Sequence, residues 1–186
     1  QIESKGTFVF IKYFLENSNE YLVVATTRPE TLFGDVCIAV NPSDKRYKKY
    51  IGKKVVLPIS NKAIPIIADK YVDIEKGTGA LKVTPAHDFN DYKIGKKHKF
   101  KPIIIFDKKG KFNDNVPHSY QQMDRIEARE KIIEDLNKIG NLQKVEKIKH
   151  FVPYGDRSNT IIEPYLTDQW FLDVKSMAKE SIIQVK

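Results

Sequence analysis

Short strands separated by turns constrain the fold of this chain more than any other feature of its sequence. Runs rich in β-branched and aromatic residues end at Gly, Pro or Asn about every 8–12 residues, as they do in barrels and curled sheets. The strand–helix alternation that a doubly wound sheet requires is missing. The pattern predicts strands over residues 7–14, 20–27, 36–40, 54–59, 64–68, 80–84, 102–106, 144–152 and 161–162.

Helical periodicity is clearest over residues 120–139, where Gly140 follows as the expected C-cap. A shorter helix is predicted over residues 88–97, with Asp88 as its N-cap, and another over residues 44–50. Together these segments predict an α+β fold that is mostly β, with a curled sheet or β-barrel core and peripheral helices.

The charge of the chain is strongly basic. The net charge is +8, and 27 of the 32 basic residues are lysine. Such an excess either attracts a polyanion such as nucleic acid or reflects a lysine-rich solvated surface, and charge alone does not separate the two. Because lysine attracts phosphates diffusely, the composition predicts salt-sensitive docking rather than base readout.

Cysteine content and hydropathy point to the cytoplasm. The only cysteine, Cys37, excludes a disulfide within the chain and a cysteine-built zinc site, and its apolar neighbours predict an inert core residue. A reducing compartment follows as the default. No apolar run approaches the roughly 18 residues of a membrane span, and the N-terminal pattern is not that of a signal peptide, so no membrane is expected.

Two segments between apolar strands are dense in polar residues, at 26–31 and 82–91. The proline of the first segment keeps Arg28 out of helical geometry, which makes that segment an extended or turning loop. In the second segment, strand alternation puts Lys82 and Thr84 on one face. The residues expected to converge at this strand-to-helix corner are Lys82, Thr84, His87, Asp88 and Asp91.

Several chemistries suit such a corner. A carboxylate pair beside Lys and Arg can hold an ammonium group, orient a water or bind a metal, and a metal fits worst because neither segment supplies three ligands at a standard spacing. The same residues also have structural interpretations: Asp88 as a plain N-cap, His87 as a structural side chain, Lys82 as a surface lysine. Since nucleotide-binding loops, Gly-x-Ser-x-Gly and His-Glu-x-x-His are all missing, the pattern alone names no reaction.

Three long stretches resemble a known family. They are TTRPETLFGDVCIAVNPSD at 26–44, GTGALKVTPAHDFNDY at 77–92 and NTIIEPYLTDQWF at 159–171. They are similar to the editing domain of valyl-tRNA synthetases, the inserted domain (connective peptide 1) of the class I synthetases for Val, Ile and Leu. The third stretch resembles the segment in which that domain returns to the catalytic core. The Thr-Arg-Pro-Glu-Thr form of the first motif favours the valine branch over the isoleucine and leucine branches.

The resemblance implies an organisation and a set of partners. Residues 1–150 are expected to form the editing barrel with its helices, and residues 151–186 a return segment toward the catalytic core. Because the His-Ile-Gly-His and Lys-Met-Ser-Lys-Ser motifs do not occur, we expect an excised editing domain that needs no cofactor or metal, whereas the parent enzyme uses ATP and Mg²⁺. The expected partners are the acceptor end of tRNA(Val) carrying threonine and the rest of the synthetase in cis, with the isolated domain a monomer.

The implied reaction is hydrolysis of the ester of Thr-tRNA(Val) by water, without a covalent intermediate. Asp91 matches the aspartate that anchors the substrate ammonium, whereas Lys76 stands where many relatives carry an aromatic residue beside the terminal adenine. Two alternatives stay open: an isoleucyl- or leucyl-type editing domain, and an RNA-binding β-barrel without hydrolysis. The resemblance implies Asp91, Asp88, Lys82, Thr84 and His87 as catalytic residues, and Thr26, Thr27, Arg28, Thr31 and Lys76 as substrate-binding residues.

Overall fold

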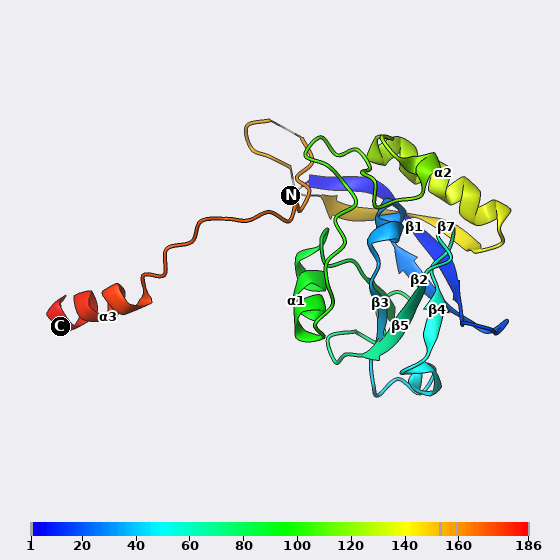
Figure 1. The fold of residues 1–186 in the computed structure, drawn as a ribbon, viewed down its shortest axis with the longest axis horizontal. Helices are drawn as coiled ribbons and strands as arrows, with labels where there is room; N and C mark the ends of the chain where they lie inside the picture. Colours follow the sequence, from blue (N-terminus) through cyan, green and yellow to red (C-terminus); the bar gives the residue numbers. More distant parts are fainter. Residues whose placement is uncertain (1, 153, 159, 186) are drawn as a thin grey trace.

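Two sheets form the body of the protein in a computed structural model that describes residues 2–152, 154–158 and 160–185 (Figure 1). The first sheet has the strand order β2-β1-β7 and the second the order β4-β5-β3-β6. The strands are β1 Ile2–Phe14, β2 Tyr21–Thr26, β3 Cys37–Val40, β4 Lys54–Val56, β5 Ala63–Ala68, β6 Ala80–Val83 and β7 Leu142–Val152.

The first sheet is an antiparallel ribbon around β1. Its hairpin partner β2 pairs from Val9↔Thr26 to Phe14↔Tyr21, and β7 pairs along the other edge with an irregularity between Phe10 and Ile11. The alternating pattern of β1 explains its orientation, because Val9, Ile11 and Tyr13 are fully buried on one face while their neighbours face outward. This ribbon therefore supplies one wall of the core.

The second sheet places the two polar segments side by side. Its central strand β3 is apolar throughout and buried at every residue, as expected for a strand covered on both faces. It pairs in parallel with β5 and antiparallel with β6, and Cys37 lies opposite Val83. The chain entering β3 and the chain leaving β6 are therefore neighbours, although they are far apart in the sequence. Burial raises the pKa of the Cys37 thiol, which fits its predicted core role.

Helices surround the sheets. A 3₁₀ helix, η1, connects β2 to β3, α1 follows β6, and α2 lies along η1 and β7 (Figure 1). Asp88 caps α1 by accepting hydrogen bonds from two backbone N–H groups, and Asp124 caps α2. The helices are η1 Pro29–Gly34, η2 Lys48–Tyr50, α1 Phe89–Lys97, η3 His118–Tyr120, α2 Arg125–Lys138 and α3 Lys175–Val185.

The α+β, mostly β fold class is confirmed, and the strands form two sheets rather than a closed barrel. An isolated bridge between Leu15 and Val55 joins β1 to β4, whereas among the described residues no ladder joins β2 to β6. The rest of the core is closed by side chains, including the ring cluster of Phe33, Phe112 and Tyr120.

Several predicted elements differ from the structure. β1 begins at Ile2 rather than at residue 7, β4 ends at Val56 rather than at residue 59, and the strand predicted over residues 161–162 is only the isolated bridge from Ile161 to Tyr154. The strand predicted over residues 102–106 is irregular, with only an isolated bridge from Phe106 to Phe112. The helix predicted over residues 44–50 is a turn followed by η2. The helix predicted over residues 120–139 begins only at Arg125, because Asp124 turns the chain and caps it.

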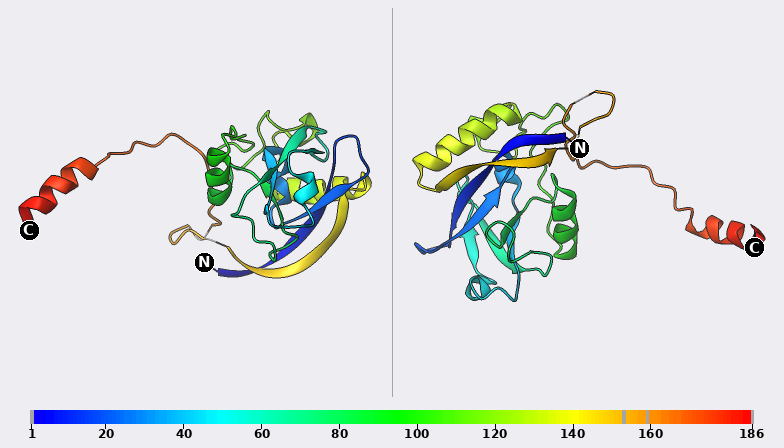
Figure 2. Two further views of the ribbon diagram at one scale, coloured as in Figure 1. Left: turned by 90° about the horizontal axis from the view of Figure 1, so that it is seen from below. Right: turned by 180° about the vertical axis from the view of Figure 1, so that it is seen from behind.

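The last part of the chain leaves the body. Strand β7 runs through the expected boundary at 150/151, and an isolated bridge joins Tyr154 to Ile161. An extended stretch then leads to α3, which projects away from both sheets in every view (Figures 1 and 2). The extended stretch before α3 includes the fully exposed Trp170. None of the described helices is both long and apolar enough to cross a membrane.

Candidate functional site

The candidate site lies where η1 meets the end of β6. Antiparallel pairing of β3 with β6 brings Lys82 and Thr84 alongside the residues that precede β3. The approach is close: a Cβ added to Gly34 would lie 2.9 Å from Thr84 Cγ2. Glycine at the end of η1 therefore allows the two polar segments to touch.

Lys82 is the centre of a buried hydrogen-bond network. Its ammonium donates to two hydroxyls, Thr31 Oγ1 at 2.6 Å and Thr84 Oγ1 at 2.7 Å. The third hydrogen bond reaches Asp35 Oδ1 at 2.8 Å. Because an ammonium group has three donors, all of them have partners, which offsets the cost of burying the charge.

Asp35 balances the Lys82 charge. Its Oδ1 also accepts from the Thr84 hydroxyl at 2.6 Å, and its Oδ2 accepts from the Tyr13 hydroxyl at 2.8 Å. Burial raises the pKa of the Asp35 carboxyl, while the Lys82 ammonium and the two hydroxyls oppose that rise. Tyr13 thereby connects the β1–β2 ribbon to the site.

Asp91 lies on the first turn of α1 and faces the end of β6. Its Oδ2 accepts from the backbone N–H of Thr84 at 2.8 Å, and its side chain is buried. Burial raises the pKa of Asp91 to about 6, although the Thr84 N–H and the Lys82 charge oppose the rise. Asp88 is exposed, and its Oδ1 accepts from the N–H groups of Asn90 and Asp91 at 2.8 and 3.1 Å.

Arg28 forms the other side of the site. Its NH1 donates to the His87 carbonyl at 2.7 Å, its NH2 contacts Glu163, and its Nε lies 3.6 Å from Glu30 Oε1. Glu30 is buried and is bound at both oxygens by Arg129, at 2.9 and 2.8 Å. This bidentate pair of Arg129 with Glu30 fixes the carboxylate that is next to the Arg28 guanidinium.

The His87 ring is held by backbone groups. Nε2 accepts the backbone N–H of Ile105 at 3.1 Å, and the ring also hydrogen-bonds to the backbone of Pro164, whose carbonyl is the acceptor. Burial lowers the pKa of His87 to about 4, and the charges of Arg28 and Lys82 act in the same direction. The ring is therefore neutral near pH 7, and its Nε2 is already occupied by the Ile105 N–H.

The remaining predicted residues are Thr26, Thr27 and Lys76. Thr26 is buried, and its Oγ1 accepts from the Arg28 N–H at 3.0 Å. Thr27 is half-buried, and Lys76 is exposed in the turn before Gly77. Neither Thr27 nor Lys76 takes part in the hydrogen bonds described for the Lys82 network.

Sequence reasoning missed the residues that hold the predicted ones in place. Asp35 lies within the recognised stretch 26–44, and a buried lysine calls for a carboxylate partner, so that signal was available. Glu163 is 135 residues from Arg28 along the chain, and no local pattern indicates such a contact. The missed residues are Tyr13, Glu30, Asp35, Arg125, Arg129 and Glu163.

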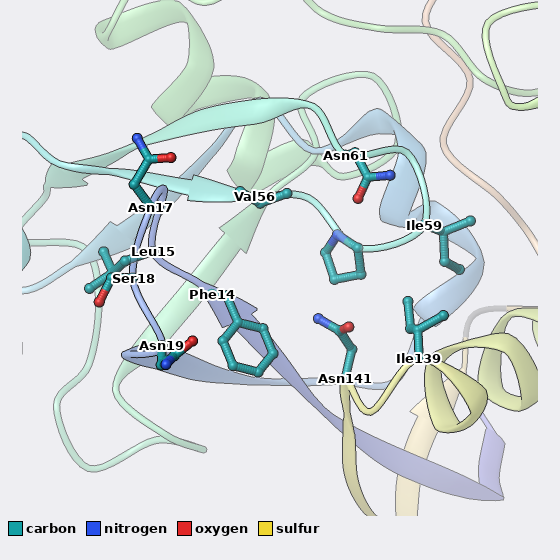
Figure 3. Close-up of a pocket in the computed structure, with 11 residues that line it drawn as sticks. Phe14, Leu15, Asn17, Ser18, Asn19, Val56, Ile59, Asn61, Ile139 and Asn141 are labelled. Carbon is teal, nitrogen blue, oxygen red and sulfur yellow. The ribbon is translucent and has the colours of Figure 1, made fainter.

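A cavity of about 440 Å³ opens beside Arg28 and His87, and Arg125, Glu163 and Tyr165 also line it. A larger cavity, of about 690 Å³, lies elsewhere, between the β1–β2 turn and the turns after β4 and α2 (Figure 3). All of its lining residues are uncharged, so the cavity beside Arg28 is the one where ionisable groups gather. No group of three or more His, Cys, Asp or Glu in the described part of the chain could hold a metal ion.

Comparisons with known proteins identify the family of the chain. The family model described as leucyl-tRNA synthetase, editing domain, matches residues 44–150. Valine–tRNA ligase of Clostridium tetani is 53% identical over 184 residues, which are 99% of this chain and 21% of that protein. The enzyme of Campylobacter jejuni is 51% identical over 183 residues, 98% of this chain and 21% of that protein. This chain thus spans about a fifth of the length of these relatives.

A solved structure supports the fold. The ternary complex of Agrobacterium radiobacter LeuRS with tRNA and LeuAMS matches with a TM-score of 0.56 and 20% identity, over 80% of this chain and 20% of that one. The family model and the fold together define an editing domain of an aminoacyl-tRNA synthetase. The chain belongs to the synthetase editing-domain family, and its similarity over its whole length is to valine–tRNA ligases.

Proposed function

We propose that this domain hydrolyses the ester bond of tRNA(Val) mischarged with threonine. The observation that carries the proposal is the buried network of Lys82, Asp35, Thr84 and Thr31 beside the Asp91 carboxylate. A threonine hydroxyl can donate a hydrogen bond to the remaining lone pairs of the Thr31 and Thr84 oxygens, whereas the methyl group of valine has no hydrogen to donate to them.

The need for a second site is physical. An apolar valine pocket rejects threonine weakly because the two side chains have nearly the same shape. This amino-acid pair is itself the standard illustration of the limit, with a discrimination of about a hundredfold. A hydrolytic site that requires the hydroxyl supplies the missing selectivity.

The proposed chemistry is direct hydrolysis. The ionised Asp91 holds the α-ammonium of the aminoacyl group, and Arg28 faces the terminal adenosine. Water forms a bond to the ester carbon, the bond from that carbon to the ribose oxygen breaks, and the ribose hydroxyl leaves with a proton taken from the water. Positioning of the water and the ester supplies the acceleration, so no covalent intermediate and no cofactor is required.

The proposed partners follow from the fact that the chain matches only about a fifth of the length of its relatives. The remainder of a valine–tRNA ligase in cis would contact the exposed apolar residues near the end of the chain, such as Trp170 and Phe171. Residues 151–186 would then be the return segment, and the cytoplasm, where tRNA is charged, would be the site of action. Without that remainder, the domain is proposed to be a monomer.

The test is deacylation of Thr-tRNA(Val) compared with Val-tRNA(Val) by this chain and by Asp91→Asn. We expect release of threonine only, and loss of about 2 kcal/mol or more of transition-state stabilisation in the variant, as for other charge-assisted hydrogen bonds. The exposed Asp114→Asn variant, which also removes one negative charge, serves as the control. Release of both amino acids would contradict the threonine assignment, and faster release from Ile- or Leu-specific tRNA would place the domain in another branch.

A further inference from the structure

Glu163 lies between two arginines that come from different elements. One of its carboxylate oxygens contacts Arg28, which follows β2, and the other contacts Arg125, the first residue of α2. The three side chains are 26%, 22% and 29% exposed for Arg28, Arg125 and Glu163, so the contact is half-buried and reachable from solvent.

Arg28 has a second partner besides Glu163, and Arg125 lies against a neighbouring turn. Arg28 donates to the His87 carbonyl at 2.7 Å. Arg125 runs across the turn at Gly110, where an added Cβ would lie 3.7 Å from its Nε. Two cations that contact the same carboxylate call for an anion between them, because otherwise they repel each other across a partly desolvated cavity.

The other acids nearby have partners of their own. Glu30 is bound at both oxygens by Arg129, at 2.9 and 2.8 Å. Asp107 accepts the backbone N–H groups of Lys109 and Lys111, at 2.8 and 2.9 Å. Glu163 is thus the carboxylate that occupies the Arg28–Arg125 pair, and Lys108 adds a further positive charge at the cavity of about 440 Å³.

Glu163 can leave this position more easily than a residue of a sheet. It follows the bridge between Tyr154 and Ile161 and lies in a stretch without regular structure. Its two arginine partners remain reachable from solvent, so a more highly charged anion can take the place of its carboxylate. A phosphate group carries charge on several oxygens and suits two arginine forks better than one carboxylate does.

We propose that Arg125 and Arg28 form a subsite for a backbone phosphate of the RNA 3′ end, and that Glu163 occupies this subsite until the phosphate displaces it. This proposal rests on the proposed function, because it assigns the phosphate to a tRNA acceptor end. Anchoring that phosphate beside His87 sets how far the terminal ribose reaches toward Asp91. Glu163 then acts as an internal competitor of RNA binding.

The test measures binding rather than hydrolysis. The probe is a short RNA hairpin with a single-stranded CCA end, compared with the same hairpin carrying a neutral methylphosphonate at its last phosphodiester. The variants are Glu163→Gln, Arg125→Gln and the charge-preserving Arg125→Lys. Glu20→Gln is the control, because Glu20 is likewise in an ion pair, with Lys49, and lies just before β2, at the opposite end of that strand from Thr26.

We expect Glu163→Gln to tighten binding of the charged hairpin by up to about fivefold, the equivalent of one half-exposed ion pair. Arg125→Gln should weaken it by about tenfold or more and reduce the salt slope of binding by about one, while Arg125→Lys retains the slope. Both effects should vanish with the methylphosphonate hairpin, and Glu20→Gln should shift both hairpins alike. Inorganic phosphate in millimolar excess should compete only if the subsite takes free phosphate as well as RNA.

Two results would overturn the proposal: Glu163→Gln binding no tighter than Glu20→Gln, or Arg125→Gln weakening both hairpins equally. Deacylation of Thr-tRNA(Val) is measured in parallel and separates the two proposals. If the wild-type chain deacylates but the hairpins do not discriminate, the subsite is refuted and the proposed function stands. If the hairpins discriminate but no deacylation occurs, the subsite stands as an RNA-binding site and the proposed function is refuted.

Discussion

The Lys82 ammonium has three oxygen partners although only 6% of the residue is exposed. A buried charge is tolerated when a counter-charge and further hydrogen bonds replace its water, and Asp35 with two hydroxyls does so here. The Lys82–Asp35 pair orients the Thr84 side chain, and the backbone N–H of Thr84 in turn holds Asp91. The positions of four site residues, Lys82, Thr31, Thr84 and Asp91, therefore depend on the Asp35 carboxylate. Asp35 was not among the residues predicted for the site.

Replacing Asp35 with Asn should leave the Lys82 charge buried without its counter-ion. We expect the free energy of unfolding to fall by about 3–5 kcal/mol, the usual cost of breaking a buried ion pair from one side. Urea denaturation measures this change. The double variant Asp35→Asn with Lys82→Met removes both charges and should recover part of the loss, and equal destabilisation of the single and double variants would contradict the pairing.

The raised pKa of Asp91 should make catalysis depend on pH. Burial shifts the Asp91 pKa upward from its ordinary value to about 6, and only the ionised form can hold an ammonium group. We therefore expect kcat/KM for Thr-tRNA(Val) to rise about tenfold per pH unit below pH 6 and to level off above it, up to about pH 8, where the α-amino group itself loses its proton.

Asp91→Asn should flatten that profile, and a rise that persists in the variant would assign it to another group. Stability should change in the opposite direction. Because the folded state binds the Asp91 proton more tightly than the unfolded state, this group's contribution is fully present at acidic pH and is lost as the pH rises through about 6. Comparing urea midpoints of the wild type and Asp91→Asn at pH 4.5 and 7 checks the sign.

At the scale of elements, α1 approaches the end of β6 through a glycine. A Cβ added to Gly95 would lie 2.6 Å from Pro85 Cγ and 2.9 Å from Pro85 Cβ. The proline ring cannot turn away as a flexible side chain would. The helix therefore carries Asp91 to Thr84 only because no side chain separates Gly95 from Pro85.

Gly95→Ala should move α1 away from the corner. Better helix propensity would stabilise the variant by about 1 kcal/mol, whereas overpacking costs about 1–3 kcal/mol, so we expect a net loss of stability and a weaker hold on Asp91. Thermal unfolding and Thr-tRNA(Val) deacylation measure the two effects. The exposed Lys96→Ala in the same helix is the control, and a Gly95→Ala variant as stable and active as this control would show that the close approach is unimportant.

Local patterns predicted the elements whose hydrogen bonds are local. The hairpin of β1 with β2 and the capped start of α1 follow from alternation and from Asp88. Residues 102–106 were predicted as a strand because they are apolar, but their backbone bonds elsewhere: the Ile105 N–H donates to His87 Nε2, and the Ile104 carbonyl accepts from the Asn113 side chain. Hydrogen bonds to side chains outside this segment thus take the place of the strand-to-strand hydrogen bonds that were expected. No local sequence pattern indicates such side-chain partners.

For the whole molecule, topology decided which parts of the site could be predicted. The two polar segments were visible in the sequence, but the pairing of β3 with β6 that brings them together was not predicted. Their supports came from elsewhere, with Tyr13 on β1, Arg129 on α2 and Glu163 beyond β7. In the sequence, a charged residue that stabilises a site cannot be distinguished from a charged surface residue. Only the three-dimensional structure shows which charges lie next to the site.

One consequence follows from counting hydrogens around Lys82. All three ammonium hydrogens are used, the Thr84 and Tyr13 hydroxyl hydrogens go to Asp35, and the Thr31 hydroxyl hydrogen goes to the Arg28 carbonyl. What this wall still offers is lone pairs on the two threonine oxygens. A ligand group that reaches it must therefore bring its own hydrogen, so the site distinguishes donors from acceptors as well as polar groups from apolar ones.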